Sequence, residues 1–371
     1  MQKIKSSISP TNAPLSRRDL VEMIRLVRAL FRLSRLPVYR HDIWQQVPEI
    51  ARFNPGHDAV MMGYDFHLSE DGPQLIEVNN NAGGGLLAYL AYQPDDPLAR
   101  GDLPRRLRDQ ILASFAEEMR RFSGSKSRLP QRIVIIDEEP EKQFLYPEMV
   151  VFKDLFAEWC QCCSSIKDPS QLEAHAGGVF VEGKPVDLIY NRHCDFYLET
   201  EAMAGIHDAY RNGTVCLTPN PFTYGLLGDK RRLAYWSNPD LLAQSGLDAK
   251  SRETILRLIP ESHLLSDLDR DQLWRERKQW VFKPAVLHAS RGVLVGSKLT
   301  RGRFDELVPE ETVVQRYIPP TRVASASGEM KTDYRLYVYR RQVLGVAARL
   351  YRGQVTNLRT EGGGFASVDL V

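Results

Sequence analysis

The sequence has no long hydrophobic run, almost no net charge and few cysteines, and each of these absences excludes a class of protein. No stretch reaches the roughly 18 to 20 apolar residues that a membrane-spanning helix needs. The first twenty residues also lack the apolar segment of a secretion signal, so we expect a cytoplasmic protein without a membrane partner. The 49 basic and 47 acidic residues leave a formal charge of only +2, so no general field attracts nucleic acid.

The five cysteines are an odd number in a long chain, which is not typical of a disulfide framework. Three of them cluster at Cys160, Cys162 and Cys163, but no second cysteine pair follows at zinc spacing, and the nearest downstream histidine is His175. Ordinary reduced thiols are therefore the favoured interpretation, and a metal site is the alternative.

A chain of 371 residues is too long for one small core and fits two or three packed domains. Helical spacing of apolar residues predicts helices over 16–36, where Pro37 ends the pattern, and over 102–122. A basic amphipathic helix such as 16–36 can also lie on a membrane surface, but packing on a core is more common. A polar stretch after the second helix places a domain boundary near residue 127, so the first domain covers 1–126.

The middle of the chain has the pattern of a small α/β domain. RIVIID, GVFVEG and VDLIYN predict strands, and helical stretches such as EMVVFKDLFAEW alternate with them, which indicates a parallel-sheet layer over 127–225. The remainder, 226–371, is rich in strand signals separated by turns. We find no internal repeat.

The segment GYDFHLSEDGPQLIEVNN predicts two short strands joined by a turn at Ser-Glu-Asp-Gly-Pro. With a three- or five-residue turn, Asp65 lies opposite Glu77, and Asn79 joins them on the same face. The other face then carries Tyr64, Phe66, Ile76 and Val78. Oxygen donors so placed suit a hard cation such as Mg²⁺. The alternative is an edge hairpin whose polar face meets water.

Three further features are typical of a ligand site. The glycines at 83–85 let the backbone approach a ligand closely. WVFKPAVLHASRGVLVG predicts a strand that carries Lys283, then a loop with Ser290, Arg291 and Gly292, in which a lysine and backbone N–H groups can hold phosphates. In the middle domain Arg192 can bind a substrate carboxylate or form a structural ion pair.

Gly-Tyr-Asp, a short loop and Leu-Ile-Glu-Val-Asn resemble the metal-binding hairpin of ATP-grasp ligases. The order of segments, with the hairpin first and the nucleotide lysines last, is similar to that of circularly permuted members such as eukaryotic glutathione synthetase and glutathionylspermidine synthetase. The resemblance covers 60–90 and 226–371. It implies an ATP-grasp fold, with a Rossmann-like pre-ATP-grasp substrate domain inserted between its two parts.

The same resemblance implies roles for residues of this sequence. Asp65, Glu77 and Asn79 hold the Mg²⁺ ions of ATP, Lys283 meets the α- and β-phosphates, and Lys230 supplies a second lysine. The loop of Ser290, Arg291 and Gly292 forms a lid, while Gln315, Tyr317 and Ile318 of TVVQRYI line the adenine.

Polar pairs in DYRLYVY and VTNLRTEGGGFA complete the expected site. Alternation along strands aims Asp333 with Arg335 at one face, and Asn357 with Arg359 at another. In similar ligases such residues contact the transferred phosphate, so the resemblance implies this role for Arg335, Asn357 and Arg359. It implies a carboxylate–amine ligase that works through an acyl phosphate on small-molecule substrates. A phosphotransferase acting on a hydroxyl and an inactive ATP-binding protein remain alternatives. The oligomeric state and the substrates are not predicted.

Overall fold

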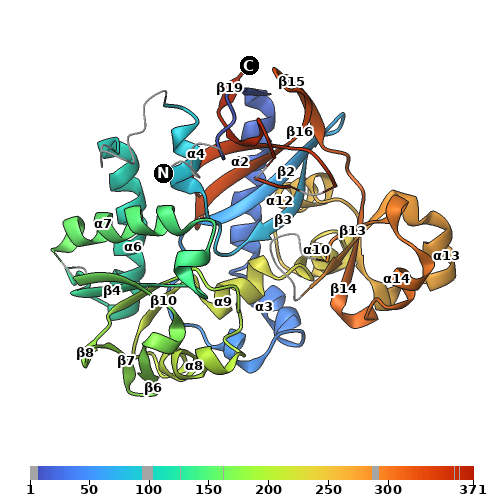
Figure 1. Cartoon of the computed structure of the whole chain (residues 1–371). Helices are drawn as coiled ribbons and strands as arrows, with labels where there is room; N and C mark the ends of the chain where they lie inside the picture. The colour runs from blue at the N-terminus through green and yellow to red at the C-terminus, as the bar shows by residue number, and fades with distance from the viewer. Residues whose placement is uncertain are drawn as a thin grey trace.

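In the computed structural model, the described residues form five β-sheets with surrounding helices, which together make a mixed α/β fold (Figure 1). The structure describes residues 7–93, 103–125, 127–161, 163–285, 292–354, 356–358 and 360–371. None of the helices in these ranges is both long and apolar enough to cross a membrane.

The largest sheet joins the two ends of the chain. Its strands run in the order β18-β17-β16-β2-β3, and β15 pairs with β16. Two strands of this sheet come from the N-terminal hairpin, β2 (Met62–Ser69) and β3 (Gly72–Asn79). The others are C-terminal: β15 (Thr321–Ser325), β16 (Gly328–Tyr339), β17 (Gln342–Tyr351) and β18 (Gly364–Ala366). In Figure 1 the blue β2 and β3 accordingly lie beside the red β16.

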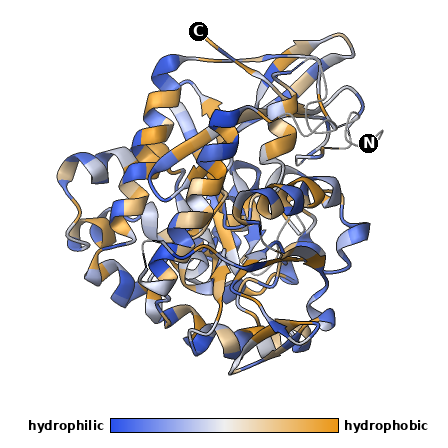
Figure 2. Cartoon of the chain, turned by 90° about the vertical axis from the view of Figure 1, so that its left-hand side faces the viewer, coloured by the Kyte–Doolittle hydropathy of each residue, from blue (hydrophilic) through white to orange (hydrophobic). Residues whose placement is uncertain are grey.

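Apolar helix faces cover this sheet. Met23, Leu26 and Leu30 of α2 (Arg17–Leu33) belong to the same buried cluster as Tyr64 and Phe66 of β2. The helices at the front of Figure 2 accordingly carry both hydrophobic and hydrophilic residues. Pro37 does not terminate α2, which ends at Leu33; it is the first residue of α3 (Pro37–Trp44), where its missing N–H costs nothing. The shorter helices α10 (Arg232–Trp236), α11 (Pro239–Gln244) and α12 (Ala249–Leu258) add to this core.

The middle of the chain forms a parallel sheet of order β10-β9-β4-β5. Its strands are β4 (Arg132–Ile136), β5 (Cys163–Lys167), β9 (Leu188–Asn191) and β10 (Cys216–Thr218), with helices α6 (Arg105–Ser123), α7 (Tyr146–Cys160) and α8 (Ala204–Arg211). GVFVEG was expected in this sheet, but β7 (Gly178–Val181) pairs antiparallel with β6 (Glu173–His175) and β8 (Lys184–Pro185). Two strands of this sheet, β5 and β10, were not among the predicted ones; β5 is hard to read because its polar CSSIK lacks a continuous apolar run, and β10 has only three residues.

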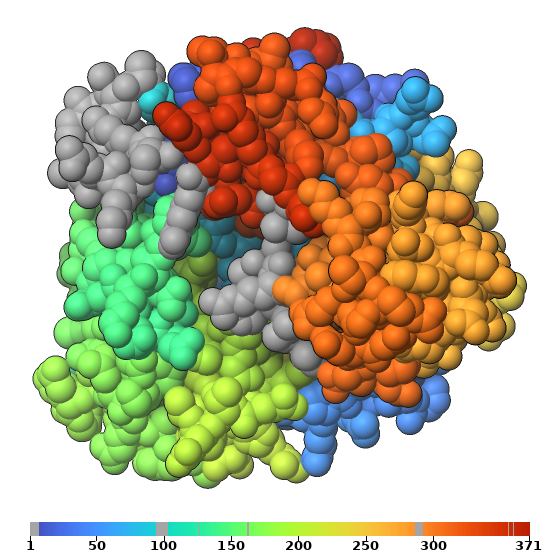
Figure 3. Space-filling view, turned by 45° about the vertical axis from the view of Figure 1, so that its right-hand side comes forward, coloured from blue at the N-terminus to red at the C-terminus, as the bar shows by residue number. Residues whose placement is uncertain are grey.

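A third, antiparallel sheet of order β11-β14-β12-β13 lies in the lobe on the right of Figure 1. Its strands are β11 (Ser262–Leu264), β12 (Trp280–Pro284), β13 (Leu294–Val295) and β14 (Thr312–Arg316), and α13 (Arg270–Glu276) and α14 (Arg301–Asp305) complete the lobe. Short strands β1 (Ala13–Leu15) and β19 (Val368–Leu370) pair near the termini. Figure 3 shows the middle domain, this lobe and the C-terminal strands meeting around a depression.

Two of the cysteine expectations can be compared with the structure. Cys160, Cys163, Cys194 and Cys216 form no disulfide bond in the described part of the chain, whereas Cys162 lies outside the described residues. Among the described residues no group of three or more His, Cys, Asp or Glu side chains is placed to hold a metal ion.

Candidate functional site

The register of the N-terminal hairpin is the predicted one, although the turn is not. Asp65 lies opposite Glu77, but Ser69 pairs with Gly72, so the turn has two residues and not three or five. Such a turn alone would put Ile76 opposite Asp65. A β-bulge between Asp65 and Phe66 absorbs one extra residue and restores the register.

The bulge also corrects the composition of the apolar face. Leu75, and not Ile76, pairs with Phe66, and both are fully buried. Ile76 instead lines a cavity on the opposite side, and its carbonyl oxygen accepts a hydrogen bond of 2.7 Å from Lys283 Nζ. The β-bulge that preserves the Asp65–Glu77 pairing thus also leaves the Ile76 carbonyl as an acceptor for Lys283.

Asp65, Glu77 and Asn79 converge as expected. Asn79 Nδ2 donates to Asp65 Oδ2 at 3.1 Å and to Glu77 Oε1 at 3.2 Å. The Asp65 carboxylate, however, is already occupied by two arginines. Glu77 and Asn79 are half-buried, whereas Asp65 is buried. The three residues are therefore neighbours with different surroundings.

Asp65 belongs to a buried ladder of alternating charges across β2, β16 and β17. Arg335 donates from Nε and Nη2 to the two Asp65 oxygens, both at 2.6 Å. Arg349 donates to Asp65 at 2.8 Å and to Asp333 at 2.6 Å, and Thr356 donates to Asp333. Burial alone would raise the pKa of Asp65, but the two arginines outweigh it and hold that pKa well below its usual range. These contacts make Asp65 a counter-ion of arginines and do not support its expected role as a direct Mg²⁺ ligand.

Lys283 is the other buried charge of the site. Its Nζ donates to the Ile76 carbonyl and, at 2.6 Å, to Gln315 Oε1. Burial lowers the pKa of Lys283 to about 8; nearby Glu77 opposes this shift and Lys230 adds to it. Lys283, Ile76, Glu77 and Gln315 all line one cavity of about 90 Å³ between the large sheet and the antiparallel lobe.

The apolar wall of this cavity contains the predicted adenine residues Tyr317 and Ile318, together with Val281, Val293 and Val295. The backbone N–H of Tyr317 is not free for a base, because it donates to the Gln279 carbonyl at 2.7 Å. The Ile318 carbonyl oxygen lies 2.7 Å from His67 Nδ1. Burial lowers the pKa of this histidine. A neutral imidazole can donate here through Nδ1–H.

Lys230 follows a π-helical turn, Tyr224–Gly228 (η5), and lies close enough to Lys283 to affect its pKa. The preceding Asp229 is buried and pairs with Arg231, while the hydroxyl of Tyr197 donates to it at 2.6 Å. Tyr197 belongs to the middle domain. Asp229 therefore fixes the backbone of Lys230 with contacts from two parts of the chain.

The glycines at 83–85 approach protein side chains, which corrects the expectation that they make room for a ligand. A Cβ atom on Gly83 would lie 2.2 Å from Arg192 Nη2, and one on Gly84 would lie 2.1 Å from the Phe365 ring. Glu148 accepts hydrogen bonds from the N–H groups of Gly84 and Leu86 at 2.7 and 2.8 Å, at the start of α4 (Gly85–Leu90). Arg192 is buried over this turn and donates to the Asn81 carbonyl at 2.8 Å.

The remaining predicted residues are only partly placed. Ser290, Arg291 and Arg359 lie outside the described residues, and Gly292 is exposed with a φ of +73°. Asn357 was expected on a strand with Arg359, but it is exposed and lies in no strand. The expected alternation holds only for Asp333 and Arg335 of β16.

Sequence reasoning missed Arg349, which lines the cavity, whereas the predicted Arg335 does not. It also missed His67. A signal was present for both residues. His67 lies two residues after Asp65, and residues two apart on a strand share a face, while Arg349 is the one charged residue in the mostly apolar QVLGVAARLY.

Comparison with known proteins places this arrangement in context. No known protein family and no curated protein matches the sequence. A glutathione synthetase-like effector from Globodera pallida, solved in its apo form, matches in structure with a TM-score of 0.59, at 10% identity over 98% of this chain and 90% of the other. The chain shares the fold of glutathione synthetase-like proteins.

A second solved structure agrees. A protein described as a gamma-glutamylcysteine synthetase from Methylobacillus flagellatus KT matches with a TM-score of 0.53, at 11% identity over 96% of this chain and 90% of the other. The resemblance drawn from the hairpin and lysine motifs is thus confirmed at the level of the fold. At such low identity the likeness concerns the fold alone, and proteins that share a fold can catalyse different reactions.

Proposed function

We propose that the chain is an ATP-dependent carboxylate–amine ligase that works through an acyl phosphate. One observation carries the proposal: Lys283 of β12 donates to the carbonyl of Ile76, so the lysine and Glu77 come to one cavity from segments some two hundred residues apart in the sequence. A buried lysine beside a carboxylate and an amide is the set of groups that a magnesium nucleotide needs.

One unsatisfied side-chain amide and one lysine with an unused N–H support a polar ligand in this cavity. Gln315 Nε2 is buried and finds no acceptor among the described residues. Lys283 uses two of its three N–H groups on acceptors in the described part of the chain. Buried polar groups are normally satisfied, so both favour a bound partner. The cavity of about 90 Å³ is smaller than a typical ligand site, so a whole nucleotide requires the lobe to move away from the large sheet.

The residues also fit Mg²⁺, with a smaller ligand set than the sequence predicted. The Glu77 carboxylate and the Asn79 side-chain oxygen share a face and are half-buried, and these are the hard oxygen donors that Mg²⁺ prefers. Asp65 is engaged by two arginines and stays outside this set. When bound, the ion would offset the negative charge of the phosphates.

In the proposed reaction a substrate carboxylate oxygen attacks the γ-phosphorus of ATP, ADP leaves, and an acyl phosphate forms. An amine then attacks the acyl carbon, inorganic phosphate leaves, and the amine loses a proton. The chain's residues position and neutralise charge, because phosphoryl transfer needs little covalent help. Lys283 and Lys230 hold phosphate oxygens, and Arg349, which lines the cavity and shares the buried ladder of charges with Asp65, takes the role predicted for Arg335.

The names of the two similar structures suggest amino acids and short peptides as a first substrate panel, to which we add polyamines. ADP release over this panel, with hydroxylamine present to trap an acyl phosphate as a hydroxamate, tests the proposal. A ligase yields ADP and a hydroxamate. A phosphotransferase yields ADP and a phosphorylated hydroxyl, and an inactive ATP-binding protein yields neither.

A matched pair of variants controls the assay. Glu77→Gln removes the proposed Mg²⁺ ligand, and we expect a loss of about 10² to 10³ in rate. Glu70→Gln makes the same chemical change in the exposed turn of the same hairpin and leaves the rate unchanged. Equal rates for folded Glu77→Gln and Glu70→Gln proteins would refute the assignment of Glu77.

A further inference from the structure

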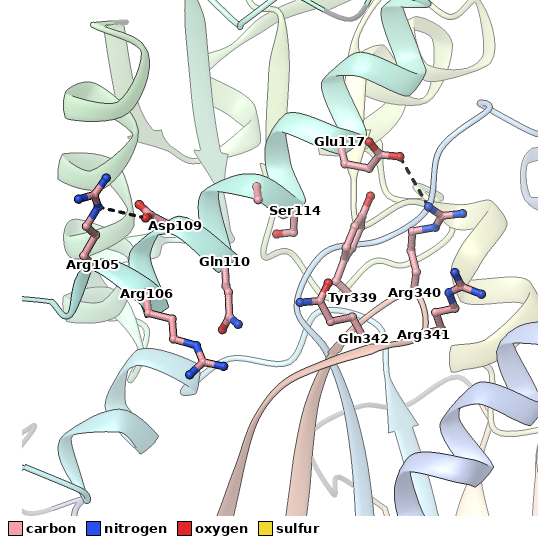
Figure 4. A pocket seen from close by; sticks show the side chains of 11 residues that line it. Arg105, Arg106, Asp109, Gln110, Ser114, Glu117, Tyr339, Arg340, Arg341 and Gln342 are labelled. Atoms are coloured by element: carbon pink, nitrogen blue, oxygen red, sulfur yellow. Dashed lines mark ion pairs between the residues drawn. The ribbon is translucent and has the colours of Figure 1, made fainter.

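A groove remote from this cavity is lined by arginines from two distant segments. It measures about 800 Å³ and lies between α6 and the turn that joins β16 to β17. One wall consists of α6 side chains, among them Arg105, Arg106 and Gln110, and the other of Tyr339, Arg340, Arg341 and Gln342 (Figure 4). No residue lines both this groove and the cavity around Lys283.

The groove carries excess positive charge that the protein does not neutralise. Four arginines face two carboxylates, Asp109 and Glu117. Asp109 pairs with Arg105 at 3.5 Å, and Glu117 is held by Arg120 and Arg121, each at 2.6 Å, and by Arg340 at 3.6 Å. Arg106 and Arg341 are both exposed and form no ion pair with a described residue.

The wall formed by the turn contacts two buried carboxylates, Asp58 and Glu118. Tyr339 pairs with Gln342, so Arg340 and Arg341 occupy a two-residue turn, and Arg340 has a φ of +57°. Glycine or asparagine is favoured at such a position, because a side chain there costs about 1 kcal/mol or more. Arg340 forms an ion pair with Asp58 at 2.9 Å that is not aligned as a hydrogen bond, and the Tyr339 hydroxyl donates to buried Glu118 at 2.8 Å. Strain that is retained in this way is typical of functional positions.

We propose that this groove binds a small organic anion with at least two phosphate or carboxylate groups. The guanidinium groups of Arg106 and Arg341 bind the anionic groups, since the planar fork of arginine matches both oxyanions. Gln110 and Gln342 add neutral donors, and the Tyr339 ring and Ala113 pack against the carbon skeleton. The volume lies within the range of small-molecule sites, and a net charge of +2 for the whole chain does not favour an extended polyanion.

Arginine-selective modification with phenylglyoxal, followed by peptide mass spectrometry, tests the site directly. Pyrophosphate and citrate serve as separate probes at constant ionic strength, so the two arms distinguish a phosphate ligand from a carboxylate ligand. We expect one probe to protect Arg106 and Arg341 but not Arg17 and Arg18, which are exposed at the start of α2. Because each arginine is read separately, binding of pyrophosphate at the nucleotide cavity does not affect the result.

A pair of double variants completes the experiment. In R106Q/R341Q the dissociation constant of the protecting probe should rise about tenfold or more, since two charge-assisted contacts are lost. R17Q/R18Q changes the net charge equally and should bind as the wild type does. Four outcomes overturn the proposal: no protection by either probe, equal protection of all four arginines, equal weakening in both double variants, or protection without a probe through self-association, as detected by light scattering.

Discussion

The charge ladder around Asp65 gives the sharpest stability prediction. Asp65→Asn keeps the shape of the side chain but removes the charge that faces Arg335 at 2.6 Å and Arg349 at 2.8 Å. All three side chains are at least nine-tenths buried, so solvent cannot replace the lost partner. Breaking a buried pair in this way typically costs about 3 to 5 kcal/mol, and we expect this range for the free energy of unfolding.

Asp71→Asn provides the control, because Asp71 is exposed in the turn of the same hairpin. Its effect should stay within about 0.5 kcal/mol. Equilibrium denaturation in urea at pH 7 measures both variants against the wild type. A loss below about 1 kcal/mol for Asp65→Asn would refute the ladder as a stabilising element.

The same ladder predicts a dependence on pH. The pKa of Asp65 is lowered in the folded state, so its contribution is present above the unfolded pKa of about 4 and is lost as the pH falls below that value. As the pH falls below 5, the free energy of unfolding should therefore decrease more in the wild type than in Asp65→Asn. Parallel losses in the two proteins would contradict the assignment.

Three other predictions concern separate parts of the molecule. Burial lowers the pKa of Lys283 to about 8, so this lysine loses its charge as the pH rises through that value. ATP affinity measured by calorimetry should therefore fall above about pH 8 in the wild type. In Lys283→Met the affinity should not change over the same pH range. Gly84→Ala should destabilise the protein by about 2 kcal/mol more than Gly124→Ala, because both glycines have positive φ but only a Cβ on Gly84 would meet the Phe365 ring. Equal decreases of the melting temperature in the two variants would contradict this. Glu118→Gln should lower the free energy of unfolding by about 3 kcal/mol in urea denaturation, because buried Glu118 lies 2.8 Å from His57. Burial opposes a charge on His57, yet the pKa of this histidine is raised well above its usual value. An unchanged free energy of unfolding would show that the pair is not ionised.

Local patterns in the sequence were enough to identify the hairpin and its register partners. Alternation fixed which residues share a face, and the apolar Tyr64, Phe66 and Val78 are buried as predicted. The turn length and the bulge were not readable, because a two-residue turn with a bulge and a longer turn without one give the same Asp65–Glu77 pairing.

Long-range contacts explain most of what the sequence left hidden. The motif predicted Asp65 as a metal ligand, but its occupation by Arg349 follows from the pairing of β16 with both β2 and β17, which no local pattern specifies. The glycines at 83–85 were correctly taken as sites of close approach, yet the neighbours are Arg192 and Phe365, from other parts of the chain. The domain boundaries near residues 127 and 225 stay a prediction.

Calorimetric titration with ATP and Mg²⁺ at pH 7 tests the central claim most directly, because it asks only whether Lys283 and the hairpin form a nucleotide site. We predict one site per chain in the wild type, affinity reduced at least about tenfold in Lys283→Met, and wild-type affinity in Arg18→Gln. The absence of ATP binding in the wild type, or equal affinity in Lys283→Met, would contradict the account.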